Sequence, residues 1–160
     1  MAVSIRPARA SDVDDIARLT AQLGYDVADS SLEQRLPGIL ARSEEQLVVA
    51  EIDGRVVGWL HVAASECVEE ELFAVICGLV VDASLRRTGI GKMLITWAEE
   101  WARQRGCSVI RLWSSVGRKA SHRFYEQMGY TIIKTQHAFA KSLLPAGRDD
   151  LKRLVPRIEE

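Results

Sequence analysis

The sequence has few of the residues that build disulfide frameworks, zinc sites or membrane spans. Its 160 residues include three cysteines, Cys67, Cys77 and Cys107. Their odd number and wide spacing fit neither a disulfide framework nor a metal site, so we expect buried free thiols in a reducing compartment and no bound metal. The longest near-continuous apolar stretch, residues 72–81, is far shorter than the roughly 20 residues that cross a bilayer. These features predict a cytoplasmic protein without membrane contact.

Aromatic side chains and net charge are also scarce. Aromatic residues make up 6% of the chain, and the formal net charge is −1. The basic residues are not interleaved with aromatics, which argues against nucleic-acid binding. Residues 1–10 carry two arginines with no apolar block behind them, which argues against a secretory signal. Hydrophobic residues at 48% and charged residues at 27% are typical of one globular domain.

The two halves of the chain carry charge of opposite sign. Residues 1–81 hold six Lys and Arg against fourteen Asp and Glu, whereas residues 82–160 hold fifteen against eight. An acidic half favours a cationic partner, and a basic half favours an anionic group such as phosphate. The alternative, that these charges only solvate helix surfaces, stays open at this point.

The most informative segment for function is LVVDASLRRTGIGK, residues 79–92. A predicted buried strand ends there, a loop with Arg86 and Arg87 follows, and Gly89 and Gly91 open a predicted helix. Glycine lets the backbone approach a ligand closely, and the first N–H groups of a helix have no acceptor within the helix. Together with the helix dipole, these groups predict a site for an anion such as a pyrophosphate.

Two well-known phosphate loops do not fit this segment. A P-loop needs a glycine five residues before Gly91 and Ser or Thr after Lys92, where the chain has Arg86 and Met93. A dinucleotide fingerprint needs a glycine where Leu94 stands. A plain strand-to-helix turn without a ligand is the remaining alternative.

Two motifs in this order resemble the GNAT superfamily of N-acetyltransferases. Arg86-x-x-Gly89-x-Gly91 after a Leu-Val-Val-Asp strand resembles its pyrophosphate loop. The segment SHRFYEQMGY, residues 121–130, resembles its second hallmark, a helix that leads into the final strand. The resemblance covers residues 3–142, which we expect to form the N-acetyltransferase domain, with residues 143–160 as a C-terminal tail.

The resemblance implies an α/β (α+β) fold. It implies a mixed, mostly antiparallel sheet of about six or seven strands, flanked by about four helices. The chain's own periodicity and turn signals agree with this order of elements. They predict strands over residues 3–6, 47–51, 55–63, 72–81, 109–113 and 130–142, and helices over residues 11–23, 31–40, 89–105 and 119–128.

The resemblance also implies acetyl-CoA as the acetyl donor and assigns residues to it. In the family, the end of the buried strand binds the pantetheine arm, the loop holds the pyrophosphate, and a helical tyrosine protonates the leaving thiolate. Tyr125 takes the position of that general acid. The alternative is that the Phe-Tyr pair of this helix only packs in the hydrophobic core. The implied coenzyme contacts are Leu79, Val80, Val81, Arg86, Arg87, Thr88, Gly89, Ile90, Gly91, Lys92, Arg118, Ser121 and Phe124.

The general base is not assigned by the sequence. Many relatives carry a glutamate four residues before the position of Leu79, but here that residue is Val75. Glu71 lies on the same predicted strand, about 13 Å away along it. His61 on a predicted strand and His122 beside the second motif are further candidates, but a lone strand histidine is more often structural, and His122 is expected on a helix surface. A water chain to bulk solvent is an equal alternative.

These observations predict an acetyl-CoA-dependent N-acetyltransferase. We expect direct attack by a primary amine of a small cationic molecule in a ternary complex, with the acceptor near Tyr25 and Asp26 of the acidic half. Transfer to a protein or peptide amine, or a CoA-binding regulatory domain with little turnover, are the alternatives. Apolar residues in the tail favour a homodimer; these are Leu151, Leu154, Val155 and Ile158.

Overall fold

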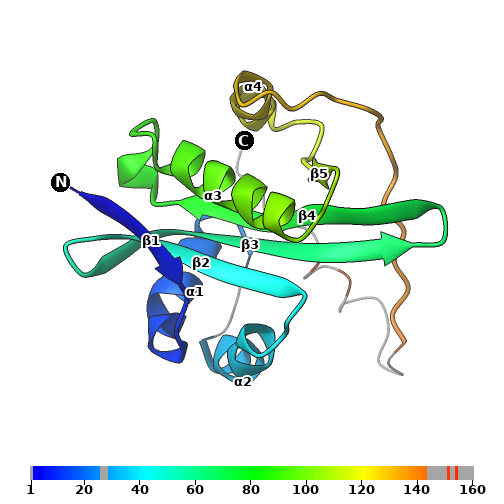
Figure 1. The fold of residues 1–160 in the computed structure, drawn as a ribbon. Helices are drawn as coiled ribbons and strands as arrows, with labels where there is room; N and C mark the ends of the chain where they lie inside the picture. Colours follow the sequence, from blue (N-terminus) through cyan, green and yellow to red (C-terminus); the bar gives the residue numbers. More distant parts are fainter. Residues whose placement is uncertain (1, 26–28, 144–150, 152–153, 155–160) are drawn as a thin grey trace. The chain divides into compact units, whose positions relative to one another are not determined.

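Figure 1 shows the computed structural model of the chain, which describes residues 2–25, 29–143, 151 and 154. The chain divides into two units. The first extends to Arg111 and contains the sheet, and the second begins at Leu112. The expected tail, residues 143–160, lies almost entirely outside the described residues.

The first unit is built on a sheet of five strands in chain order, β1-β2-β3-β4-β5. Its first four strands pair antiparallel with their neighbours, whereas β4 and β5 pair in parallel. The sheet is therefore mixed and mostly antiparallel, as predicted. Its strands are β1 (Val3–Pro7), β2 (Glu45–Ile52), β3 (Arg55–Cys67), β4 (Glu70–Val81) and β5 (Ile110–Arg111).

Helices cover both faces of this sheet. Helices α1 (Val13–Ala21) and α2 (Asp29–Leu40) lie on one face, and α3 (Ile90–Gln104) lies on the other (Figure 1). The first face buries side chains at helical and strand spacing, among them Ile16, Leu19, Leu36, Leu47, Val49 and Trp59. α3 buries Ile90, Leu94, Ile95, Ala98, Trp101 and Ala102 on its inner side.

A glycine on β3 lets α3 lie close to the sheet. A Cβ atom at Gly58 would stand 2.9 Å from the Val80 carbonyl oxygen and 3.4 Å from Leu94 Cδ1. Only a residue without a side chain fits that space. The close packing fixes the start of α3 beside the end of β4, where the predicted phosphate turn lies.

The second unit contains α4 (Lys119–Gln127). The order of elements agrees with the prediction up to this helix, but the expected last strand over residues 130–142 is not formed in the described chain, so the sheet has five strands rather than six or seven. Strand preference yields a strand only where a partner strand supplies hydrogen bonds. Here β5 has two residues instead of the expected five, and residues 131–141 are exposed.

The described residues bear on the expectations about cysteines, membrane spans and metal sites. The prediction of buried thiols is wrong, because Cys67 and Cys77 are exposed and Cys107 is only half-buried. Cys67 lies next to the hairpin turn, and Cys77 lies beside the irregularity of β3–β4 pairing at His61 and Val62. Among the described residues, no helix is long and apolar enough to cross a membrane, and no cluster of His, Cys, Asp and Glu could hold a metal ion.

Candidate functional site

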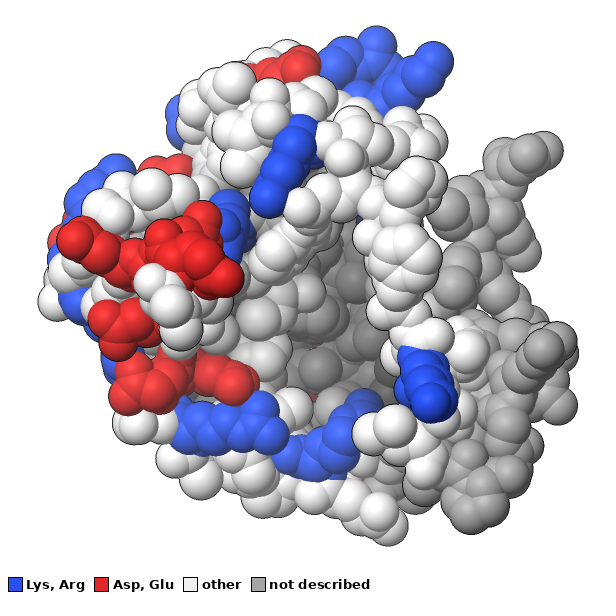
Figure 2. Space-filling view, turned by 90° about the vertical axis from the view of Figure 1, so that its right-hand side faces the viewer, with Lys and Arg blue, Asp and Glu red and all other residues white. Residues whose placement is uncertain are grey.

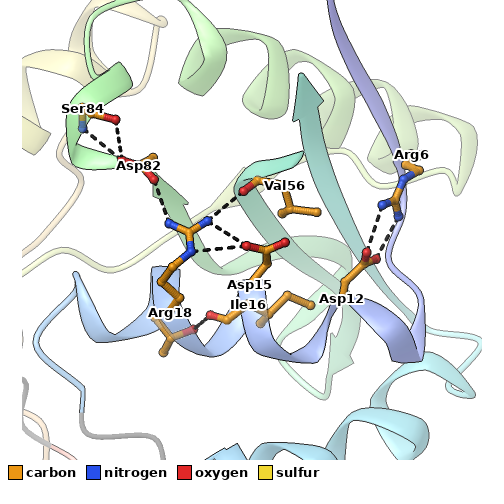
Figure 3. A network of polar contacts seen from close by, with 9 residues as sticks. Arg6, Asp12, Asp15, Ile16, Arg18, Val56, Asp82 and Ser84 are labelled. Atoms are coloured by element: carbon orange, nitrogen blue, oxygen red, sulfur yellow. Dashed lines mark hydrogen bonds and ion pairs between the residues drawn. The ribbon is translucent and has the colours of Figure 1, made fainter. Parts of the chain in front are cut away.

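The turn after β4 is anchored by Asp82, a buried aspartate. Its carboxylate accepts hydrogen bonds from the Ser84 backbone N–H at 3.1 Å, from the Ser84 hydroxyl at 2.8 Å, and from Arg18 Nη1 at 2.8 Å (Figure 3). These bonds, first of all the one from the Ser84 hydroxyl, lower the pKa of Asp82 from 3.8 to about 2. Arg18 also donates to Asp15 and to the Val56 carbonyl, both at 2.9 Å. α1 therefore holds the first half of the turn.

The second half of the turn has the backbone shape of an anion site. Arg87 and Gly89 have positive φ angles of 66° and 90°, and Gly89 is the residue at which α3 begins. The first N–H groups of α3 have no acceptor within the helix, so they are free to bind an anion. The Thr88 hydroxyl donates a hydrogen bond to the Leu85 carbonyl at 2.6 Å, and this bond between two loop residues stabilises the loop.

The basic side chains of this turn take no part in ion pairs among the described residues. Arg86, Arg87 and Lys92 are exposed, and none forms an ion pair with another residue in the part of the chain that the structure describes. A guanidinium without a partner carboxylate can form a paired hydrogen bond to a phosphate. The structure thus brings together the seven loop residues predicted from the sequence, residues 86–92, at one helix end.

The end of β4 has one unpaired edge. β4 pairs with β5 only at Ala74 and Val75, so residues 76–81 have no strand partner on that side within the described chain. On the other side, Leu79, Val80 and Val81 pair with β3. The free N–H and C=O groups of such an edge can bind an extended ligand that carries amides. This edge leads directly into the turn at Asp82.

The second unit contains the other predicted residues. On α4, the rings of Phe124 and Tyr125 meet edge to face at 5.2 Å, and Tyr125 meets Tyr130 at 5.9 Å. Burial raises the pKa of Tyr125, although the Arg118 charge opposes this. A phenol is protonated at neutral pH already at its ordinary pKa, and the shift keeps Tyr125 in that form. Arg118 is the residue before α4, and Ser121 is half-buried in its first turn.

The predicted acceptor residues are only partly described. Tyr25 is 37% exposed after the end of α1, and Asp26 lies outside the described residues. Acidic side chains gather on the face shown in Figure 2, toward which the β3–β4 hairpin projects. The exposed glutamates of that hairpin are Glu66, Glu69, Glu70 and Glu71.

The structure separates the candidates for the general base. Val75 lies on β4 and has an apolar side chain that cannot accept a proton, and Glu71 is exposed near the hairpin. His122 Nε2 lies 2.9 Å from the Ser115 carbonyl oxygen, so the imidazole has a structural role near the start of α4. His61 is half-buried, and its Nε2 lies 2.8 Å from the Glu45 carboxylate, a partner that the sequence did not reveal.

A cavity of about 160 Å³ lies beside His61. It opens between α1, α2 and the strands β2 and β3, all of which belong to the first unit. Neither the cavity nor Trp59 in its wall was anticipated from the sequence. Its lining residues are Ile16, Thr20, Leu32, Arg35, Leu36, Ile39, Leu47, Trp59 and His61.

Comparisons with known proteins agree with this geometry. The profile of the acetyltransferase (GNAT) family matches residues 12–130. The chain belongs to the GNAT family. The family uses acetyl-CoA as its acetyl donor.

Individual N-acetyltransferases are also similar to the chain. An uncharacterised N-acetyltransferase from Methanocaldococcus jannaschii is 33% identical over 97 residues, which cover 58% of this chain and 42% of that relative's length. An aminoglycoside N(6')-acetyltransferase from Klebsiella aerogenes is 28% identical over 87% of this chain and 96% of the relative. The solved aminoglycoside 6'-N-acetyltransferase of Acinetobacter baumannii shares the fold, with a TM-score of 0.78 at 22% identity over 89% of this chain and 99% of that one.

Proposed function

We propose that this GNAT protein transfers the acetyl group of acetyl-CoA to a primary amine of a small cationic molecule. The observation that carries the proposal is the turn after β4. In a chain of this family it combines a left-handed Gly89 at a helix N-terminus with two exposed arginines that have no carboxylate partner among the described residues. We propose one N-acetyltransferase domain over residues 3–142, in a cytoplasmic homodimer that involves the tail.

The donor side of the proposed site uses backbone groups more than side chains. The unpaired edge of Leu79, Val80 and Val81 binds the two amides of the pantetheine arm. The N–H groups of residues 88–92 surround the pyrophosphate, and Arg86 and Arg87 add charge. Arg118, Ser121 and Phe124 are proposed as further coenzyme contacts in the second unit.

Tyr125 is proposed as the proton donor to the departing thiolate. A phenol is protonated at neutral pH at its ordinary pKa, and burial raises the pKa of Tyr125 further, so the donor form is the one present. The aromatic contacts to Phe124 and Tyr130 hold the ring. Tyr130 also donates its backbone N–H to the Tyr125 carbonyl at 3.0 Å, which fixes the end of the helix.

Direct attack by the amine is supported by the state of two cysteines. Cys77 as a whole is exposed, but its thiol is partly screened from solvent by its neighbours; this desolvation raises the pKa of Cys77, and the Glu45 charge raises it further. Burial also raises the pKa of Cys107, although Arg105 opposes this. A thiol that stays neutral is a poor nucleophile, so these residues are not expected to carry the acetyl group.

The acceptor is proposed to be cationic because the first half of the chain is acidic. The exposed glutamates of the β3–β4 hairpin and the region of Tyr25 and Asp26 would attract an ammonium group. An aminoglycoside, a polyamine and an amino acid derivative represent this class. A peptide with a free N-terminus represents the protein-directed alternative.

The test is release of CoA thiol from acetyl-CoA, measured with a thiol reagent for each amine in turn. The proposal expects release that depends on the small cationic amines and is fastest with one of them. Release with the peptide alone would favour a protein N-acetyltransferase. Tight acetyl-CoA binding without amine-dependent release would favour a regulatory CoA-binding domain.

A further inference from the structure

The cavity between the helices α1 and α2 and the sheet has a mainly apolar wall with one imidazole in it. Side chains alternate along a strand, so Trp59 and His61 of β3 point to the same face. Both line the cavity. Trp59 is only 9% exposed, and its buried Nε1 has no acceptor in the described part of the molecule. A buried donor without a partner is uncommon in a protein core, and a water molecule or a ligand in the cavity is a group that can accept from it.

His61 is held by a carboxylate from the neighbouring strand. Its Nε2 lies 2.8 Å from Glu45 Oε2, and Arg42 Nη1 donates to Oε1 of the same carboxylate at 3.0 Å. Because a carboxylate only accepts, Nε2 carries the hydrogen, and Nδ1 of the neutral ring keeps its lone pair. Nδ1 forms no hydrogen bond with the described residues.

The imidazole stands one strand away from the proposed donor edge. His61 is paired with Gly78, and the next pair joins Leu60 to Leu79, where the proposed pantetheine edge begins. Neighbouring strands lie about 4.8 Å apart. Val75, on the same strand as that edge, has no group that accepts a proton. A carboxylate from β2 and an imidazole from β3 thus form an acid–base pair beside the cavity.

We propose that His61, oriented by Glu45, accepts a proton from the ammonium group of the acceptor, and that the cavity receives the carbon skeleton next to that amine. The inference rests on the proposed function. The ammonium gives one proton to Nδ1, and the neutral amine nitrogen forms a bond to the thioester carbonyl carbon. The C–S bond then breaks, the departing thiolate takes its proton from the proposed donor Tyr125, the second amine proton restores the phenol, and His61 returns its proton to solvent.

The charged groups around His61 suit this role. Burial alone would raise the pKa of Glu45, but hydrogen bonds from His61 and Arg42 outweigh it and lower that pKa. The carboxylate is therefore ionised at neutral pH and stabilises a protonated imidazole. Arg35 of α2 lines the cavity as well, and Cys77 of β4 stays a neutral thiol near Glu45.

The test compares pH profiles of kcat/KM for the fastest small amine of the panel. His61→Gln keeps a donor for Glu45 but removes the proton acceptor. At neutral pH we expect its kcat/KM to fall by roughly 10²–10⁴-fold. The deficit should shrink as the pH approaches the pKa of the amine, because the amine is then already neutral. Glu45→Gln should show the same trend with a smaller loss.

His137→Gln is the matched control, since His137 is exposed and makes no interaction with the described residues. Its profile should follow that of the wild type. His61→Asn is measured beside His61→Gln. For each variant the free energy of unfolding is determined, and the acetyl-CoA affinity is measured by calorimetry; this affinity should equal that of the wild type. A deficit that is equal at every pH, or no deficit, overturns the role of His61. Lack of amine-dependent thiol release by the wild type instead refutes the proposed function.

Discussion

Gly89 offers the sharpest test of the coenzyme turn, because a matched glycine lies at the other end of the same helix. Gly89 has a φ of 90° at the start of α3, and Gly106 has a φ of 80° just after its end. A Cβ atom at either position would meet nothing within 4 Å. Alanine therefore brings backbone strain without a clash at both sites.

The expected magnitudes separate folding from binding. Holding an L-residue in the left-handed region costs about 1–2 kcal/mol, so Gly89→Ala and Gly106→Ala should lose similar free energies of unfolding in urea. Only Gly89→Ala should also weaken acetyl-CoA binding, by at least about tenfold, or about 1.4 kcal/mol. The reason is that its Cβ occupies the space through which a phosphate approaches the backbone. Gly89→Val should lose more affinity.

Isothermal titration calorimetry with acetyl-CoA measures the binding part of this prediction. Gly106→Ala should bind with wild-type affinity despite its lower stability. If Gly89→Ala also binds acetyl-CoA as the wild type does, the turn is not the pyrophosphate site and the coenzyme must bind elsewhere.

Three further predictions follow from other parts of the chain. Tyr125→Phe should leave acetyl-CoA affinity nearly unchanged and slow single-turnover acetylation by roughly 10²–10⁴-fold; a rate within threefold of wild type would show that water or another residue supplies the proton. Asp82 has its pKa lowered from 3.8 to about 2, so its stabilising effect is present above pH 3.8 and is lost as the pH falls toward 2. In urea unfolding, the free energy of unfolding of Asp82→Asn should therefore fall less than that of the wild type as the pH is lowered across that window. Parallel plots of this free energy against pH for the two proteins would show that Asp82 is not the group responsible. A chain ended after Leu144 should sediment as a monomer if the tail forms the homodimer, and an unchanged mass would exclude that role.

The sequence predicted α3 almost to the residue because its signals are local. The prediction was residues 89–105, and the helix is Ile90–Gln104. Apolar periodicity defines its length, and the glycines at both ends adopt positive φ angles that other residues disfavour. The same local signals placed Gly89 at the start of α3 and the exposed arginines in the turn before it.

The pairing of Glu45 with His61 could not be read from the sequence. Counting outward from the hairpin turn, where Ile52 pairs with Arg55, would place Gln46 opposite His61. A register shift between Ala50 and Glu51 instead pairs Leu47 with His61. One additional residue in a strand reverses which side chains share a face, so the carboxylate beside His61 appears only in the folded chain.

The missing last strand shows the opposite limit. Residues 130–142 have the composition of a strand, including Ile132, Ile133 and Phe139, but all three are exposed in the described structure. Strand formation depends on a partner edge, which local sequence does not specify. The sequence therefore predicted four of the five strands closely. It predicted β5 longer than it is, and it predicted one further strand that the described chain does not form.

Direct acetyl transfer is tested most directly by a single turnover with enzyme in excess over acetyl-CoA, quenched at intervals and analysed by mass spectrometry. The account predicts that acetylated amine and free CoA thiol appear together, in equal amounts and with one rate constant, while the protein mass stays unchanged. Acetylated protein that forms before the product would contradict direct attack. Thiol release without acetylated amine would contradict the transfer itself.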